Sequence, residues 1–298
     1  MTPSTPARHP LKAGLRPVSR LSVVLGVLLA GVSIVGVATG LDGLYEPYPA
    51  AAAGLFAQDL VVLLVALPLL GTSMLLARRG STVALLAWAG VLFYAAYTYY
   101  FMAIGAFTAL FPAYVLIVAV ATYGLLSLLF ASDADGVAAA VRDGVPRRLI
   151  AAFFLVSVAL FVILWGGLVA STLAADYILS PVQHLVVAID VAILLPILAY
   201  AGLQLLRRAP SGYLLAGMLI VKAGLTGFTL AFTGAFAMWW SGRFEASEGL
   251  LVAIFSVMAI MAVALWTPFA RPARPRAASD ATSDPARGRP TVVDGRAS

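Results

Sequence analysis

The 298-residue chain contains no cysteine and little charge. The absence of cysteine excludes disulfide bonds, thiolate metal sites and iron–sulfur clusters. Only 11% of the residues are charged whereas 62% are hydrophobic, and a soluble domain of this length needs more polar surface to cover its core. Histidine is rare as well: His184 is the only one near an apolar run, which excludes a haem held by two histidines within the membrane.

The hydrophobic residues are grouped into runs that can each cross a bilayer, which takes roughly 20 helical residues. The sequence therefore predicts an all-α integral membrane protein with eight transmembrane helices. The first run follows a basic segment as in a signal peptide, but it is longer than the usual apolar region, which favours an uncleaved span. The predicted spans cover residues 21–41, 54–77, 82–104, 107–130, 149–174, 182–206, 212–238 and 249–269.

The basic residues predict the orientation of these spans. With both termini in the cytoplasm, 17 of the 19 Lys and Arg residues lie on the inner side, and only Lys222 and Arg243 do not. This distribution follows the positive-inside rule and argues against a surface that binds nucleic acid. The preference for Arg over Lys is typical of GC-rich coding sequence and indicates a multi-pass protein of a bacterial inner membrane.

The outer loops have the opposite charge balance, with five acidic residues and Arg243 alone as a basic one. This balance is consistent with an electronegative vestibule that concentrates cations. Aromatic residues gather at the same level, and their simplest interpretation is an interfacial belt. The acids are Asp42, Glu46, Asp176, Glu245 and Glu248, and the aromatic residues are Tyr45, Tyr48, Tyr99, Tyr100, Tyr177, Trp239 and Trp240.

Two halves of the chain resemble each other. When Asp59 is placed over Asp190, a glycine, a double arginine and a Gly-Ala-Phe follow in the same order in both halves. Four spans per half give both halves one orientation, which predicts parallel repeats related by an axis along the membrane normal. The predicted organisation is a cytoplasmic tail over 1–19, repeats over 20–130 and 148–270, a cytoplasmic loop over 131–147 with a short interfacial helix, and a disordered cytoplasmic tail over 271–298.

Asp59 and Asp190 each lie in the outer half of a predicted span, and each is followed by a proline, Pro68 or Pro196. Proline cannot donate a backbone hydrogen bond, so it frees a carbonyl group in the preceding turn. Carboxylates beside such loosened backbone form cation and proton sites in membrane proteins. The alternative is that the two acids only hold helices together through buried hydrogen bonds or an ion pair.

Four other polar residues are candidates for a site. Lys222 lies midway along the seventh span, where a charge needs a partner, and Asp190 on the preceding helix is the natural candidate. His184 lies in the first turn of the sixth span and is either an interfacial hydrogen-bonding group or a relay to Asp190. Tyr94 and Tyr97 belong to one aromatic stripe, which either packs helices or lines a pocket for a ring-bearing or lipidic ligand.

The sequence leaves three functions open. The first is a small transporter or channel-like protein that binds a cation or proton between its halves, through Asp59 and Asp190. The second is a non-catalytic scaffold, lipid-binding protein or subunit of a larger membrane complex. The third is a membrane enzyme that acts on lipid or quinone, although no nucleophile, metal-ligand, phosphate-loop or dinucleotide motif occurs. The sequence therefore predicts no cofactor and no metal site.

Overall fold

The computed structural model describes residue 11 and residues 14–48, 51–105, 107–175, 178–179 and 181–270. The described part is helical and contains no strand. The predicted tail over 271–298 and most of the tail over 1–19 lie outside the described residues. The elements are α1 (Arg16–Thr39), α2 (Ala52–Val61), η1 (Val62–Ala66), α3 (Leu67–Arg78), α4 (Thr82–Gly105), α5 (Phe111–Ala131), α6 (Ala134–Val141), α7 (Arg147–Ala174), α8 (Pro181–Ile189), η2 (Asp190–Leu194), α9 (Leu195–Leu206), α10 (Pro210–Ser241) and α11 (Ala246–Ala270).

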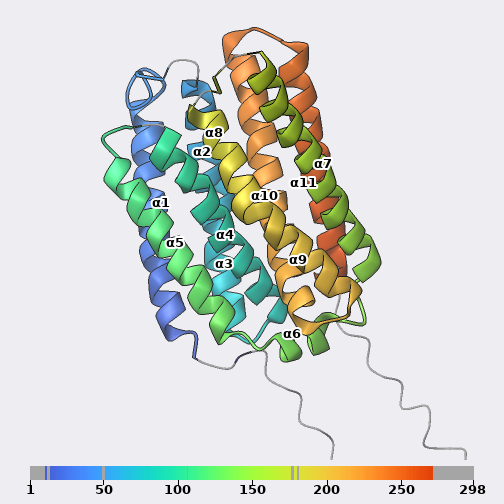
Figure 1. Cartoon of the computed structure of the whole chain (residues 1–298). Coiled ribbons are helices and arrows are strands. Elements are labelled where there is room, and N and C mark those ends of the chain that lie inside the picture. Colours follow the sequence, from blue (N-terminus) through green and yellow to red (C-terminus); the bar gives the residue numbers. More distant parts are fainter. Residues whose placement is uncertain are drawn as a thin grey trace, which may run out of the picture.

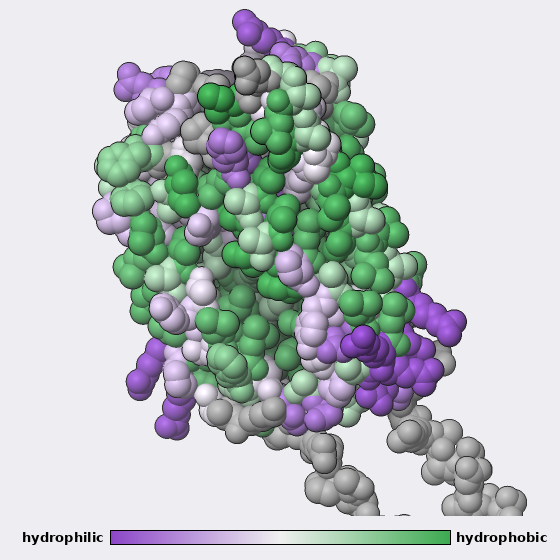
Figure 2. All heavy atoms as spheres, viewed as in Figure 1, coloured by the Kyte–Doolittle hydropathy of each residue, from purple (hydrophilic) through white to green (hydrophobic). Residues whose placement is uncertain are grey.

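Eight helical segments of the described chain are long and apolar enough to cross a membrane, which confirms the predicted polytopic membrane protein. Each predicted run corresponds to one of them, and α2, η1 and α3 together form the second span, as α8, η2 and α9 form the sixth. Figure 2 shows the apolar band that these helices present, with hydrophilic residues gathered at its two ends. The short helix α6 lies between the fourth and fifth spans, as predicted.

Two span boundaries differ from the prediction by more than three residues. The first span begins earlier, at Arg16, because Pro17 is well accommodated in the first turn of a helix. The fourth span begins later than residue 107, at Phe111, because Thr108 forms a turn there. The carbonyl group of Thr108 accepts from the Phe111 amide at 3.0 Å, and its hydroxyl accepts from the Leu110 amide at 3.2 Å. The hairpin between the third and fourth spans is therefore less tight than the sequence indicated.

Helices α4 and α10 form the centre of the bundle and pack against each other. They are the two most deeply buried spans, while α11 and α7 are the least buried. Around them, α1 and α5 lie on one side and α7 and α11 on the opposite side (Figure 1). The central helices approach closely at Gly90 of α4, where an added Cβ would lie 2.8 Å from the carbonyl oxygen of Met218 on α10.

The second and sixth spans each contain a widened turn just before a proline. In these π-helical turns, η1 and η2, the amide of Leu67 donates to Val62 and that of Leu195 donates to Asp190, five residues back. The wider turn avoids the clash between a proline ring and the carbonyl group of an ordinary α-helical turn. Sequence reasoning predicted loosened backbone at these prolines, and π-helical turns are often found at functional sites.

Candidate functional site

Asp59 is buried in the second span, with only 2% of its surface exposed. The hydroxyl of Tyr45 donates a short hydrogen bond of 2.5 Å to its Oδ2 atom. The hydroxyl of Ser33 on α1 is also within hydrogen-bonding reach of the carboxylate. Close approach of α1 depends on Gly36, because a Cβ at this position would overlap the carboxylate and lie 2.8 Å from the Tyr45 hydroxyl.

Tyr45 comes from the loop that joins α1 and α2, and it folds inward until its side chain is fully buried. Burial first, and then the neighbouring Asp59 carboxylate, raise the pKa of Tyr45 well above its usual range, so that the phenol keeps its proton as a hydrogen-bond donor. The Tyr114 hydroxyl lies near that of Tyr45 on one side and near that of Thr108 on the other. The three hydroxyl groups therefore lie one after another toward Asp59, and the last of them, Tyr45, donates the hydrogen bond to its carboxylate.

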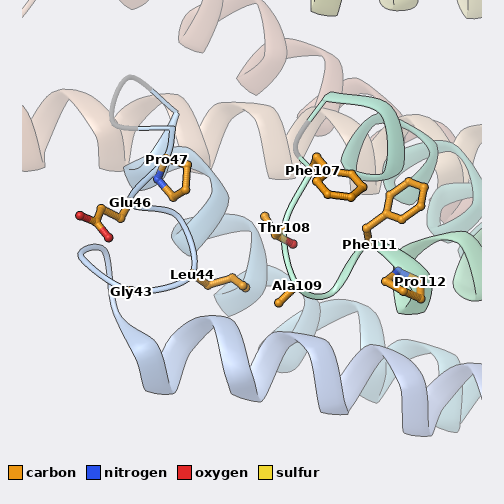
Figure 3. A pocket seen from close by; sticks show the side chains of 9 residues that line it. All are labelled: Gly43, Leu44, Glu46, Pro47, Phe107, Thr108, Ala109, Phe111 and Pro112. Carbon is orange, nitrogen blue, oxygen red and sulfur yellow. The ribbon is translucent and has the colours of Figure 1, made fainter.

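Thr108 also lines a cavity of about 560 Å³ at the end of the first four spans that lies opposite α6. Two loops form this cavity, the one before α2 and the one before α5, and in Figure 3 the side chains of Leu44 and Thr108 extend toward each other from them. Glu46 stands at the rim with its carboxylate turned away from Thr108 (Figure 3). The row of hydroxyl groups from Thr108 to Tyr45 therefore begins at this open cavity and ends beside a buried carboxylate.

Asp190 forms a second site, in the first residue of the widened turn η2, with 3% of its surface exposed. The Tyr97 hydroxyl donates to Oδ1 at 2.6 Å, and the indole Nε1 of Trp165 donates to Oδ2 at 3.1 Å. Tyr97 belongs to α4 in the first four spans, and Trp165 belongs to α7. Asp190 thus binds one residue from the first four spans and one from the last four, whereas the partners of Asp59 all come from the first four spans.

Lys222 approaches Asp190 only through Tyr97. Its Nζ atom lies 3.6 Å from the centroid of the Tyr97 ring and 5.9 Å from that of Phe93. Lys222 is 4% exposed, and among the described residues it forms neither a direct ion pair nor a hydrogen bond. The predicted Asp190–Lys222 contact is therefore indirect: the aromatic face of Tyr97 binds the ammonium group and its hydroxyl binds the carboxylate.

The other candidate residues have different surroundings. Tyr94 is buried, and its hydroxyl shares a 2.9 Å hydrogen bond with that of Thr229 on α10, so it does not face Lys222 as Tyr97 does. His184 is exposed near the start of α8, away from the buried Asp190. The predicted relay from His184 to Asp190 stays a prediction.

The central helix α4 reaches both aspartates. Tyr97 binds Asp190 directly, and Tyr99 lies 3.4 Å from the Ser33 hydroxyl, which in turn approaches Asp59. The two sites share no hydrogen-bond partner among the described residues, so they are separate sites on opposite faces of one helix. Both are built from single carboxylates surrounded by O–H and N–H donors. No group of three metal-ligating side chains occurs in the described chain.

The sequence analysis did not identify Tyr45, Ser33 and Trp165 as partners of the aspartates. By their place in the sequence Tyr45 and Tyr99 fit an interfacial belt, but both are fully buried, with 0% and 1% of their surfaces exposed. Trp239 and Trp240, by contrast, are exposed at 73% and 59%, as belt residues would be. An aromatic residue near an interface gives no signal in the sequence that would separate these two outcomes.

The aspartates also differ in register. Pro68 follows Asp59 by nine residues, whereas Pro196 follows Asp190 by six. Asp59 therefore precedes its widened turn, and Asp190 is the first residue of its own. The alignment that superposes the aspartates is not the one that superposes the widened turns, so the predicted repeat remains a prediction.

No protein-family model matches the chain, and no curated protein and no solved structure shows significant similarity to it.

Proposed function

We propose that this chain is a small proton-coupled transporter or proton channel-like protein in which Asp59 and Asp190 accept and release the proton. The observation that carries the proposal is that both carboxylates are buried inside membrane spans, each bound to a tyrosine hydroxyl and neither paired directly with a cation among the described residues. Buried acids of this kind are costly to keep charged in a bilayer and commonly mark proton relays.

The surroundings favour a proton over a metal cation as the ion that is bound. Each site offers a single carboxylate, and its neighbours are Tyr, Ser or Trp groups that donate hydrogen bonds toward it. A bound cation such as Na⁺ or Ca²⁺ would need several oxygen ligands facing inward. A proton needs only one acceptor oxygen, which each of the two carboxylates supplies.

The route to Asp59 is supported by the row of hydroxyl groups that begins at the cavity beside Thr108. A hydroxyl can accept one proton while it donates another, so Thr108, Tyr114 and Tyr45 can pass a proton inward without any of them staying charged. Water in the outer cavity would supply the proton, and the acidic outer loops would raise its local concentration. Asp59 would then be the first buried acceptor on the outer side.

Asp190 supplies a second acceptor next to a buried base. The Lys222 ammonium and the Asp190 carboxylate influence each other electrostatically across Tyr97. Loss or gain of a proton at one of these two groups therefore changes the affinity of the other group for a proton. This coupling between titratable groups is the feature that would link proton binding to a rearrangement of α4 against α10.

A scaffold or a subunit of a larger complex is the second candidate function. The observation that favours it is the position of α7 and α11, which lie at one side of the bundle and leave most of their apolar surface exposed (Figure 1). A partner helix could cover this surface as well as lipid does.

We further propose, from the charge distribution and the Arg-rich composition, that both termini are cytoplasmic and that the membrane is a bacterial inner membrane.

Proton flux into liposomes containing the purified protein tests the proposal. A potassium diffusion potential drives the protons, and an enclosed pH-sensitive dye reports them. We expect Asp59→Asn and Asp190→Asn each to lower the flux about tenfold or more, since each removes the proton acceptor while leaving a similar shape. Asp135→Asn, at an exposed position of α6, is the matched control and should keep the flux of the original protein.

Each outcome distinguishes the candidates. If the wild-type protein conducts protons and both buried variants do not, the proton role stands. If the variants conduct as well as the original but melt at a lower temperature, the aspartates hold helices together and the scaffold function is favoured. A wild-type protein without flux above that of empty liposomes would contradict the proposal.

A further inference from the structure

A second cavity, of about 450 Å³, opens at the opposite end of the bundle from the first. It lies where the start of α1 meets the end of α3, and these two helices contact each other along the second span. None of its residues belongs to the aspartate sites. The cavity is lined by Arg16, Ser19, Arg20, Val23, Val24 and Arg78.

Three arginines converge on this cavity. Arg16 and Arg20 are one helical turn apart on α1, so they lie on the same face, and Arg78 comes from the last turn of α3. Among the described residues, none of the three forms an ion pair with a carboxylate. The first turn of α1 has no side-chain cap, so its free N–H groups add to the positive potential. The cavity is therefore suited to an anion.

Ser19 provides an independent sign that this cavity takes a hydrogen-bonding ligand. Its side chain is 8% exposed and lines the cavity, yet its hydroxyl has no hydrogen-bond partner among the described residues. A buried hydroxyl without a partner is costly, and most such groups in folded proteins are satisfied. Rotation of the Ser19 side chain toward the cavity would let its hydroxyl donate to an acceptor oxygen there, which the arginines would attract at the same time.

The cavity continues into an apolar surface. Val23 and Val24, one turn further along α1, are exposed at 55% and 46% and face the region that the bilayer occupies. A ligand that fits has a negatively charged oxygen-rich head beside the arginines and Ser19, and a hydrocarbon tail that runs along the valines. Basic pockets between transmembrane helices at the cytoplasmic side bind the head groups of anionic lipids.

We propose that this cavity binds the phosphate of an anionic phospholipid from the leaflet at the arginine-rich end, with an acyl chain against Val23 and Val24. The arginines donate charge-assisted hydrogen bonds to the phosphate oxygens, and Ser19 donates a further one. The proposal commits to a lipid because the exposed valines continue from the charged part of the cavity. It does not depend on proton transport by Asp59 or Asp190.

The binding of phosphatidylglycerol tests this site. The purified protein in a non-ionic detergent is titrated with phosphatidylglycerol, with phosphatidylcholine of the same acyl chains, or with inorganic phosphate. Bound lipid is counted by native mass spectrometry, and the melting temperature is followed in parallel. For the original protein, we expect phosphatidylglycerol to bind more tightly and to raise the melting temperature more than phosphatidylcholine, and inorganic phosphate to have little effect.

Two variants and a matched control locate the binding. The triple variant Arg16→Gln, Arg20→Gln, Arg78→Gln should lose the preference for phosphatidylglycerol. Ser19→Ala, which keeps every charge, should weaken binding about tenfold, the loss expected for one hydrogen bond to a charged group. The control triple variant, Arg148→Gln, Arg207→Gln, Arg208→Gln, removes equal charge from the same end of the bundle and should bind as the original protein does.

Several results would overturn the proposal. Equal binding of the two lipids by the original protein would show that no anionic lipid site exists. An equal loss of binding in the control triple variant would assign the effect to overall charge, and unchanged binding by Ser19→Ala would place the lipid elsewhere. If inorganic phosphate alone stabilised the protein as much as phosphatidylglycerol, the site would be for a free anion.

Discussion

A carboxylate inside a bilayer is tolerated when its oxygens accept hydrogen bonds. Tyr45 and Tyr97 provide these bonds for Asp59 and Asp190, at 2.5 Å and 2.6 Å. Tyr97 has a second role, because the face of its ring binds the Lys222 ammonium group. Tyr97 therefore binds both a buried acid, Asp190, through its hydroxyl and a buried base, Lys222, through its ring.

Gly36 permits the approach of α1 to Asp59, so Gly36→Ala should disturb that site. The added methyl group would overlap the carboxylate, and the short hydrogen bond from Tyr45 would have to lengthen or break. We expect the free energy of unfolding to fall by about 1–3 kcal/mol, which is the cost of a buried polar group that loses its partner. Thermal melting in detergent measures this change.

Gly31→Ala on the same helix is the matched control, because nothing lies within 4 Å of the Cβ position there. Alanine also has the higher helix propensity, so this variant should melt at the original temperature or slightly above it. Equal melting temperatures for the two variants would show that Gly36 is not needed for the approach to Asp59.

A double-mutant cycle tests the contact between Lys222 and the Tyr97 ring. We expect Lys222→Met and Tyr97→Leu to be coupled by about 1–2 kcal/mol, because either change removes the cation–π interaction. Tyr97→Phe keeps the ring and loses only the hydroxyl, so its coupling to Lys222→Met should be smaller. Strict additivity of Lys222→Met and Tyr97→Leu in the melting free energies would exclude the contact.

At the scale of the helix, glycine and proline determine how the elements meet. Gly90 allows α4 and α10 to pack backbone against backbone at the centre of the bundle, and Gly217 of α10 lies close to Leu86 in the same interface. Pro68 and Pro196 require the widened turns in the second and sixth spans. Small residues are a common means of close helix packing in membranes.

Gly90→Ala should therefore weaken the central contact. Its Cβ would lie 2.5 Å from the Cβ of Val221 and 2.8 Å from the Met218 carbonyl oxygen, so α10 has to move away. We expect the free energy of unfolding to fall by about 1–3 kcal/mol, as it does when an extra methyl group is forced into a packed interior. Thermal melting in detergent measures this change. Gly166→Ala on α7, where nothing lies within 4 Å of the Cβ position, should have no such effect.

The elements were predictable from the sequence to a large extent because the bilayer requires long apolar runs, and each of the eight runs corresponds to a helix. The prolines also predicted loosened backbone near the aspartates. Partners of the aspartates were not predictable, because Tyr45 reaches Asp59 from a folded loop and Trp165 reaches Asp190 from another helix. Such contacts depend on the orientation of each helix about its own axis relative to its neighbours. A mostly apolar sequence gives little information on that orientation.

At the scale of the whole molecule, the bundle has two chemically different ends. Arginines gather beside α6 and the start of α1, while acidic residues lie on the loops at the other end. One cavity lies at the end with the acidic loops, and the other, at the opposite end, is lined by arginines. This polarity predicts which side of the molecule faces the cytoplasm.

Cysteine labelling tests the orientation without background, since the chain contains no cysteine of its own. Cysteines at Glu46 and Glu245 should react with a membrane-impermeant maleimide added to intact cells, and a cysteine at Ser132 should react only after the cells are opened. Labelling at Ser132 in intact cells would contradict the proposed orientation and with it the outer access to Asp59.

The measurement that most directly tests the central claim is infrared difference spectroscopy of the protein in lipid membranes, between acidic and alkaline buffer. A carboxylic acid that gains or loses its proton inside the protein gives a carbonyl band that shifts in heavy water. We predict such a band, with one component absent in Asp59→Asn and another absent in Asp190→Asn. A difference spectrum that both variants leave unchanged would contradict the claim that these two aspartates exchange protons.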